Sequence, residues 1–148
     1  MFTHEAALSR PEHAAAGAAA GAVAWTLRLE GAVVLTVAVL AYRALGANWW
    51  LFALLFLVPD VSMLGYFVGR RFGAATYNVG HTYLAPGALA LLGSVAGLPV
   101  FYPVLLIWVS HIGFDRLLGY GLKYPRAFAA THLGWVGGRA GAEVAREI

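Results

Sequence analysis

The stretch VFYPVLLIWVSHIGFDRLL, residues 100–118, joins an apolar run to His111, Asp115 and Arg116 in its second half. Its length matches the roughly 20 largely apolar residues that a helix needs to cross the hydrocarbon core of a bilayer. His111 and Asp115 are four residues apart, so a helix places both on one face. The stretch therefore predicts a membrane-spanning helix that carries a polar site.

The composition of the whole chain favours the same class of protein. Charged residues make up 11% of the sequence, against about 25% in soluble domains, and hydrophobic residues make up 61%. The net charge of +3 is small and the basic residues are not clustered, which argues against a nucleic-acid-binding protein. The absence of cysteine excludes disulfides, thiolate metal ligands and a cysteine nucleophile. We expect a lipid bilayer to surround most of the chain.

Three earlier segments are also long and apolar enough to span a membrane, and the short sequences GAN, GRRFG and GLP separate the successive spans. The predicted spans are residues 27–45, 49–68, 74–96 and 100–118. We therefore predict an all-α polytopic membrane protein, a four-transmembrane-helix bundle. Its predicted parts are an Ala/Gly-rich cytoplasmic tail (1–24), the membrane domain (25–126) and a C-terminal interfacial or cytoplasmic segment (127–148).

The basic residues predict the orientation in the membrane. Most of them precede the first span, lie between the second and third, or follow the fourth. Because Lys and Arg are enriched in cytoplasmic loops, both termini are expected in the cytoplasm of a bacterial cell, with the protein in the inner membrane. The even number of predicted spans agrees with this orientation. Glycines 65, 69 and 73, spaced by four, predict close helix packing.

Four ionisable residues within the spans are expected to meet. Each costs roughly 2.5–3.5 kcal/mol at the centre of an inserted helix, and burial costs least where such groups pair. At 1.5 Å per residue, Asp60 lies about 12 Å from the predicted cytoplasmic end of its span, and His81 and His111 about 10 Å from theirs. Asp115 lies nearer the surface on the same side. This shared depth predicts one cluster.

The chemistry of this cluster suggests a metal centre. Two carboxylates and two imidazoles are suitable ligands for Zn²⁺, Mn²⁺ or Fe²⁺, and a metal with an open position activates water for hydrolysis. The candidate catalytic and metal-binding residues are Asp60, His81, His111 and Asp115. The candidate substrate-binding residues are Asn78, Arg116, Lys123, Tyr124 and His132.

Several segments of the chain resemble one family. They are LRLEG, FLVPDVSMLGYFVGRRFGAATYNVGHTYLAP, HIGFDRLLGYGLKYP and THLG. Together they are similar to the bacterial integral membrane proteins catalogued as domain of unknown function 4260, over about residues 27–134. The resemblance implies a small multi-span membrane protein and carries no activity.

A looser likeness concerns the order of polar residues. PD, then HT after the next loop, then H-x-x-x-D is similar to the order in membrane-bound metal-dependent hydrolases of the type induced in DNA-damage responses. Here PDVS lacks a second Asp, and the HT order is reversed.

The working hypothesis is a metal-dependent hydrolase that acts on a lipid or another amphiphile. Two alternatives stay open. One is a proton-relay, ion-relay or transport protein, which would form a homo-oligomer because four short spans make a thin wall for a pore. The other is a structural or partner-binding membrane protein, in which the polar network only fixes helix packing.

Overall fold

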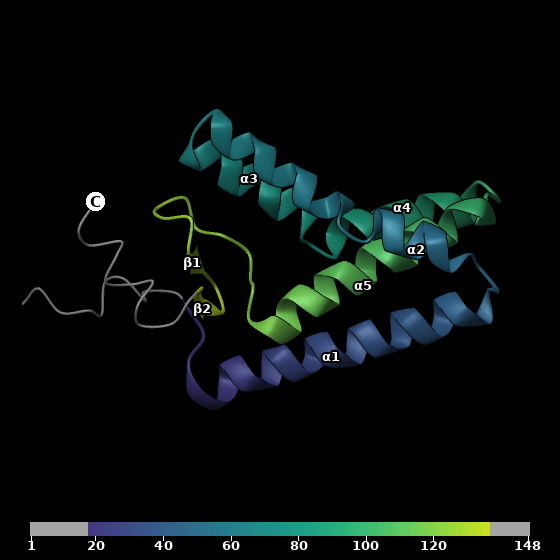
Figure 1. Ribbon diagram of the computed structural model, residues 1–148, viewed down its shortest axis with the longest axis horizontal. Helices are drawn as coiled ribbons and strands as arrows, with labels where there is room; N and C mark the ends of the chain where they lie inside the picture. The colour runs from purple at the N-terminus through teal and green to yellow at the C-terminus, as the bar shows by residue number, and fades with distance from the viewer. Residues whose placement is uncertain (1–17, 137–148) are drawn as a thin grey trace, which may run out of the picture.

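The computed structural model describes residues 18–136, which form a helical body with a small hairpin at one end (Figure 1). The α-helices are α1 (Gly21–Ala44), α2 (Trp49–Leu55), α3 (Arg70–Gly80), α4 (Leu84–Val95) and α5 (Tyr102–Leu118). Two 3₁₀ helices, η2 (Val58–Phe67) and η3 (Pro99–Phe101), precede α3 and α5. The antiparallel strands are β1 (Ala130–Thr131) and β2 (Gly134–Trp135).

Three helical segments are long and apolar enough to cross a membrane: Gly21–Ala44, Trp49–Phe67 and Pro99–Leu118. They correspond to the first, second and fourth predicted spans. α1 begins at Gly21, so the last residues of the predicted tail are already helical. Large apolar side chains are widely exposed, as a lipid-facing surface requires; Trp50 and Phe67 are 84% and 89% exposed.

The third predicted span is not one continuous helix, and here the prediction of four continuous spanning helices is wrong. α3 ends at Gly80, α4 begins at Leu84, and neither reaches spanning length. Pro86 supplies the physical reason. A proline inside a helix lacks the N–H that would bond to the carbonyl of Thr82, and its ring clashes with that carbonyl. The helix therefore stops before Thr82 and restarts with Pro86 in its first turn.

The second span changes its winding at a proline. α2 ends at Leu55, and η2 begins at Val58 with Pro59 in its first turn. Ten residues of 3₁₀ helix is long for this conformation, which is usually found in short pieces. Asp60 lies in the first turn of η2, where the positive end of the helix dipole favours a carboxylate.

Glycines allow two pairs of helices to approach closely. A Cβ on Gly31 of α1 would collide with Arg116 and the Gly113 carbonyl of α5, and a Cβ on Gly113 would collide with the α1 backbone. Between η2 and α3, a Cβ on Gly65 would collide with Thr76, and one on Gly73 with Tyr66. The predicted glycine packing is therefore confirmed at positions 65 and 73. Gly69 instead forms the turn before α3, and a Cβ there would meet no atom within 4 Å.

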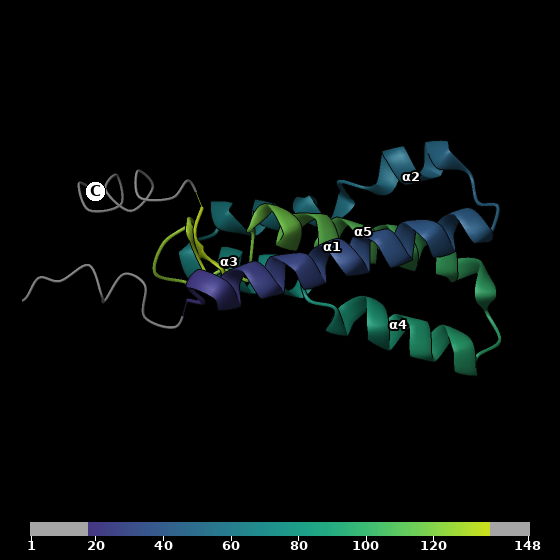
Figure 2. The same ribbon diagram turned by 90° about the horizontal axis from the view of Figure 1, so that it is seen from below.

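The chain after α5 folds back beside the start of α1. It turns at Gly119, in a left-handed conformation, and then forms the β1–β2 hairpin. The Ala19 N–H donates to the His132 carbonyl at 2.7 Å, which ties the hairpin to the beginning of α1. Figures 1 and 2 both place the hairpin near that end of α1. Of the predicted interfacial segment, residues 137–148 lie outside the described residues.

Candidate metal centre

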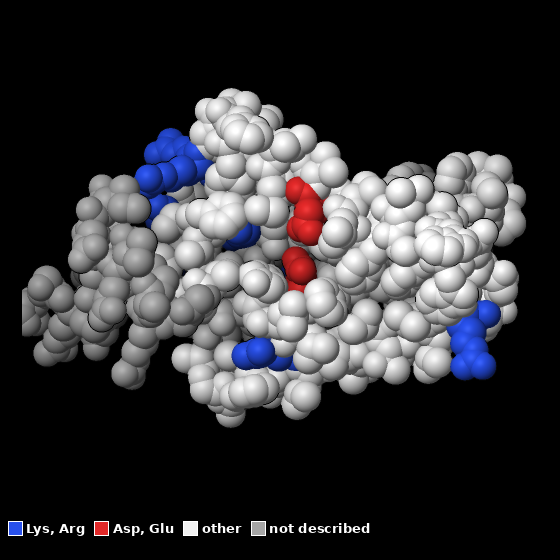
Figure 3. Space-filling model, in the orientation of Figure 1, with Lys and Arg blue, Asp and Glu red and all other residues white. Residues whose placement is uncertain are grey.

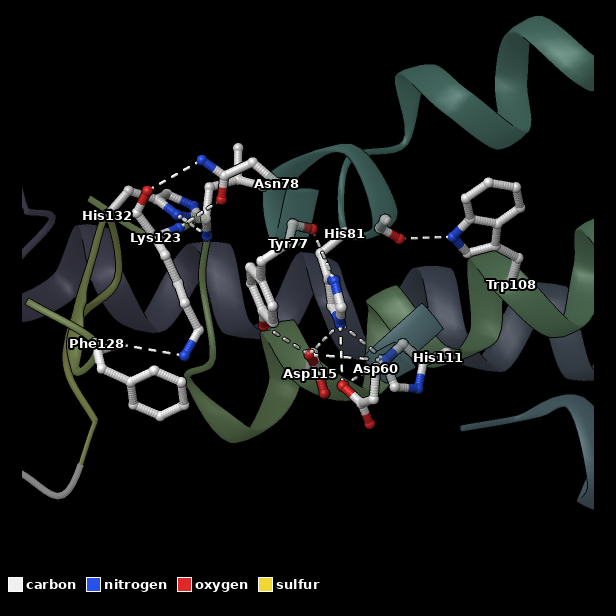
Figure 4. A network of polar contacts seen from close by, with 12 residues as sticks. Asp60, Tyr77, Asn78, His81, Trp108, His111, Asp115, Lys123, Phe128 and His132 are labelled. Atoms are coloured by element: carbon white, nitrogen blue, oxygen red, sulfur yellow. Dashed lines mark hydrogen bonds and ion pairs between the residues drawn. The ribbon is translucent and has the colours of Figure 1, made fainter. Parts of the chain in front are cut away.

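Four side chains from three elements converge on one point (Figure 4). Asp60 comes from η2, His81 from the residue that ends α3, and His111 and Asp115 from successive turns of α5. Each offers one nitrogen or oxygen atom, and these four atoms all lie within 4.8 Å of one another. The predicted convergence of the four residues is confirmed, while their roles as ligands stay a prediction.

The orientation of the His81 ring is set by the backbone of its own helix. His81 Nδ1 lies 2.9 Å from the Tyr77 carbonyl oxygen. A carbonyl only accepts, so Nδ1 carries the proton, and in the neutral ring Nε2 presents a lone pair. Nε2 faces Asp60 Oδ1 at 3.2 Å, His111 Nε2 at 3.1 Å and Asp115 Oδ2 at 3.5 Å.

The separations between these atoms match those of a small metal site. His111 Nε2 lies 3.6 Å from Asp60 Oδ1 and 3.8 Å from Asp115 Oδ2. Ligands about 2.0–2.1 Å from a tetrahedral metal are separated from one another by about 3.3–3.4 Å. The five distances that involve a histidine nitrogen are 3.1–3.8 Å and bracket that value.

The cluster is closed on its imidazole side and open on its carboxylate side. The His81 and His111 side chains are 3% and 2% exposed, whereas the Asp60 side chain is 40% exposed and that of Asp115 15%. Figure 3 shows acidic atoms near the middle of an otherwise mostly uncharged face, with basic atoms beside them. Solvent or a ligand therefore approaches the cluster past the carboxylates.

Neighbouring side chains hold the cluster in place. The Tyr77 ring stacks on His81 at 3.7 Å between ring centroids, and its hydroxyl donates to Asp115 Oδ2 at 3.1 Å. Phe56 packs edge-on against His111. Trp108 Nε1 donates to the Gly80 carbonyl at 2.6 Å, where the break after α3 leaves that carbonyl without a helical partner. His111 Nδ1 is buried without a hydrogen-bond partner among the described residues.

A cavity of about 200 Å³ adjoins the open side of the cluster. Its lining residues are Asp60, Met63, Tyr77, Asp115, Tyr120, Lys123, Phe128 and Val136. The cavity thus joins both carboxylates of the cluster to a basic residue from the loop after α5.

Lys123 is the one basic residue among the described residues that line this cavity. The residue is only 6% exposed, and Nζ donates to the Phe128 carbonyl at 3.1 Å. Nζ also lies 3.4 Å from the centroid of the Phe128 ring and 4.7 Å from that of Tyr77. Burial lowers the pKa of Lys123 to about 8, although Asp115 and Asp60 oppose this shift.

The other predicted substrate-binding residues lie near Lys123 or apart from the cluster. Both ends of the Asn78 amide bond the backbone of Lys123: Nδ2 donates to its carbonyl at 3.0 Å, and Oδ1 accepts from its N–H at 2.7 Å. Arg126 lies over the Tyr124 ring. Asn78 therefore positions the backbone of Lys123, and its role in binding substrate stays a prediction.

Arg116 and His132 form a separate pair. Arg116 Nη1 lies 2.7 Å from His132 Nε2, and the guanidinium lies over the Tyr83 ring. His132 Nδ1 accepts from the Leu122 N–H, and burial together with Arg116 lowers the pKa of His132. The structure thus does not bring His132 to the cluster.

Sequence reasoning missed Tyr77, Trp108 and Phe128. Tyr77 carried a usable signal, because it precedes His81 by four residues and a helix places both on one face. Trp108 carried none, since its contact with Gly80 joins elements far apart in the chain. Phe128 lies only five residues from Lys123, but no helical or strand spacing relates the two.

One comparison with known proteins gives a match. A family model described as Domain of unknown function (DUF4260) matches residues 24–136. No curated protein matches the chain, and no solved structure does. Because the family description names no activity, function has to be inferred from the site.

Proposed function

This chain belongs to the family Domain of unknown function (DUF4260), and we propose that its Asp60, His81, His111 and Asp115 cluster binds a divalent metal ion that hydrolyses a lipid or another amphiphile. One observation carries the proposal. The His81 Nε2 lone pair faces two carboxylate oxygens and a second imidazole nitrogen at 3.1–3.5 Å.

A metal ion explains this arrangement better than a packing network does. With Nδ1 protonated, His81 can only accept at Nε2, and ionised carboxylates can only accept. His111 Nε2 has at most one proton to share among these acceptors. Acceptors that face one another beside two buried imidazoles are unfavourable without a donor between them, whereas a divalent cation there would satisfy all four.

The donor set and the shape of the site favour Zn²⁺, with Mn²⁺ as the next choice. Two imidazole nitrogens and two carboxylate oxygens suit either ion, and the separations that involve a histidine nitrogen, 3.1–3.8 Å, are close to those around zinc. Four protein ligands fill a tetrahedral shell, so a water or substrate oxygen would enter as a fifth ligand from the cavity on the carboxylate side. A metal there lowers the pKa of bound water and supplies a hydrolytic nucleophile at neutral pH.

Tyr77 forms hydrogen bonds to two of the predicted metal ligands, one through its backbone carbonyl and one through its hydroxyl group. The carbonyl accepts from His81 Nδ1, and the hydroxyl donates to Asp115 Oδ2. Hydrogen bonds of this kind orient metal ligands and fix the tautomer of a ligating histidine. Tyr77 is thus a positioning residue in this proposal.

The membrane arrangement that accompanies the site has four passes, one of them broken. α3 and α4 together make the third pass, and the break between them lies at the cluster. Irregular backbone at membrane depth is tolerated where it lines a protein cavity. The distribution of Lys and Arg supports an inner-membrane protein with both termini in the cytoplasm.

Metal analysis of the detergent-purified full chain tests the proposal. We expect about one Zn²⁺ or Mn²⁺ per chain, because the cluster supplies one set of ligands. His81→Ala and His111→Ala should each lose most of the metal. His132→Ala is the matched control, since it removes an imidazole that lies outside the cluster, and it should keep the metal. Wild-type protein that contains no stoichiometric metal would contradict the proposed metal centre.

A proton relay is the second candidate, favoured by one continuous chain of contacts. Tyr77 bonds Asp115, both carboxylates adjoin His81, and Asp60 reaches the exposed side. Such a chain exchanges protons without a metal. Metal-free protein that carries protons in proteoliposomes, and loses this flux with Asp60→Asn and Asp115→Asn, would favour the relay.

A further inference from the structure

We propose that Lys123 and the metal cluster form the two ends of one binding site for a phosphoryl group, carried by a lipid headgroup or by free phosphate. The metal end of this site rests on the proposed function above, whereas the Lys123 end stands on its own contacts.

Lys123 is a buried cation with unused hydrogen-bonding capacity. An ammonium group has three donors, and among the described residues only the Phe128 carbonyl accepts from Nζ. Within residues 18–136, no carboxylate lies within ion-pair distance of it. A buried charge without a counter-ion is unfavourable, so an anion that enters the cavity satisfies it.

The structure holds this cation in position by its surroundings. The ring of Phe128 lies nearest to Nζ, with those of Tyr77 and Tyr66 farther away. Aromatic faces stabilise a cation while leaving its donors free. The two hydrogen bonds from Asn78 fix the backbone of Lys123. The ammonium group of Lys123 is thus held in position in the absence of a ligand.

Lys123 and the carboxylates Asp60 and Asp115 line the same cavity. Without a metal, the two carboxylates and the ammonium carry a net negative charge that repels anions. A bound divalent ion reverses that sign. The cavity then has a positive centre on each of two walls, which selects a ligand with anionic oxygens pointing in different directions.

A phosphoryl group meets this requirement better than a carboxylate does. Its terminal oxygens are arranged tetrahedrally, so one can approach the metal while another accepts from Lys123. The two oxygens of a carboxylate point to the same side. The cavity of about 200 Å³ has room for such a group, and its apolar lining residues Met63, Phe128 and Val136 suit an amphiphile.

The reaction that follows for an ester substrate is phosphomonoester hydrolysis. The oxygen of water forms a bond to phosphorus, and the ester P–O bond breaks. One proton of the water passes to the departing alcohol oxygen, and the other stays on the product phosphate. No oxidant, reductant or further reactant is needed.

Calorimetric titration of the metal-loaded full chain in detergent tests the site. The ligands are inorganic phosphate and dihexanoyl phosphatidic acid. Lys123→Met should weaken both by about tenfold to 100-fold, as expected for the loss of a charge-assisted hydrogen bond. Methionine keeps an unbranched apolar stem that packs against aromatic rings, but it lacks the ammonium group. Arg126→Gln is the matched control, because it removes an exposed cation from the same loop, and it should bind like wild type.

Metal content measured on the same samples separates the two proposals. A Lys123→Met protein that holds metal and binds phosphate like wild type overturns the phosphoryl site and leaves the metal centre standing. Wild-type protein that holds no metal but binds phosphate through Lys123 contradicts the metal centre and the two-ended site, and leaves an anion contact at Lys123 alone. If Arg126→Gln weakens binding as much as Lys123→Met, surface charge explains the result and the site is overturned.

Two further comparisons complete the experiment. Tighter binding of phosphatidic acid than of phosphate identifies a lipid headgroup as the source of the phosphoryl group, and equal binding identifies free phosphate.

Lys123→Gln is a second neutral variant for the case that Lys123→Met does not load metal. It should show the same loss of phosphate binding, and wild-type affinity in that variant contradicts the proposal.

Discussion

At the scale of single residues, the site depends on how each polar group is engaged. His81 uses one ring nitrogen on a backbone carbonyl, which leaves the other aimed at the cluster. Lys123 is held by its backbone and by aromatic rings, which leaves its ammonium facing the cavity. Both ends of the Asn78 amide form hydrogen bonds to the backbone of Lys123, so this candidate substrate-binding residue positions Lys123.

The pKa of Lys123 leads to a pH dependence of anion binding. Because this pKa is lowered to about 8, the ammonium is charged below that pH and neutral above it. The ratio of phosphate affinities, wild type over Lys123→Met, should therefore fall toward one as the pH rises through about 8. The titratable groups that face Lys123 are Asp60 and Tyr66 from η2, Tyr77 from α3, Asp115 from α5, and Tyr120.

The ratio cancels the ionisation of phosphate itself, since both proteins meet the same ligand. A ratio that stays constant from about pH 7 to pH 9 would show that Lys123 does not bind the anion through its charge.

The stability of the fold should change with pH in the opposite direction to the affinity ratio. Because the pKa of Lys123 in the folded chain lies below its ordinary value of 10.5, the free energy of unfolding should rise with pH between about 8 and 10.5.

At the scale of secondary-structure elements, two interruptions create the site. Pro59 ends the α-helical part of the second span and starts η2, with Asp60 in its first turn. Pro86 prevents α3 from running on into α4, so His81 lies at a helix end. Each interruption frees backbone groups, and Trp108 satisfies one of them at Gly80.

Trp108→Phe tests whether this hydrogen bond holds the end of α3. The substitution keeps an aromatic ring but leaves the buried Gly80 carbonyl unsatisfied, which should lower the free energy of unfolding by about 1–3 kcal/mol. It should also weaken metal binding, because His81 follows Gly80 directly. Denaturant titration and chelator competition measure these two effects.

The matched control is Trp50→Phe, since Trp50 is 84% exposed. That variant should have the stability and the metal affinity of wild type. Equal losses in the two variants would mean that the bond from Trp108 to Gly80 contributes nothing specific.

At the scale of the whole molecule, close packing brings the interrupted elements together. Gly31 and Gly113 let α1 approach α5, while Gly65 and Gly73 let η2 approach α3. α5 then carries His111 and Asp115 to the carboxylate of Asp60 and the imidazole of His81. α4 continues away from the break beside the other helices, as Figure 2 shows.

Cysteine labelling tests the four-pass arrangement, and the chain suits it because it has no cysteine of its own. Ala47→Cys and Ala96→Cys should react with a membrane-impermeant maleimide added outside intact cells. Arg71→Cys and Arg126→Cys should react only after the membrane is opened, because the positive-inside rule places them in the cytoplasm. Labelling of Ala96→Cys and Arg71→Cys from the same side would show that α3 and α4 do not cross the membrane together.

The sequence by itself determined the class of protein and the members of the cluster. Low charge and long apolar runs are sums over residues, so they identify membrane helices without any knowledge of packing. The cost of each ionisable residue in a membrane is likewise local, which is why the meeting of Asp60, His81, His111 and Asp115 could be expected from their depths.

Tertiary structure alone decided how those groups face one another and what lies beside them. The third predicted span is not one continuous helix. Hydropathy alone does not show that Pro86 prevents a helical hydrogen bond to a backbone carbonyl one turn earlier. His132 was named as a candidate substrate-binding residue, and its two ring nitrogens contact Arg116 and the backbone of Leu122. The cavity and the packing of the Tyr66 and Tyr77 rings around Lys123 arise from contacts between distant segments. Such contacts depend on the three-dimensional packing of the helices, which no local pattern of residues encodes.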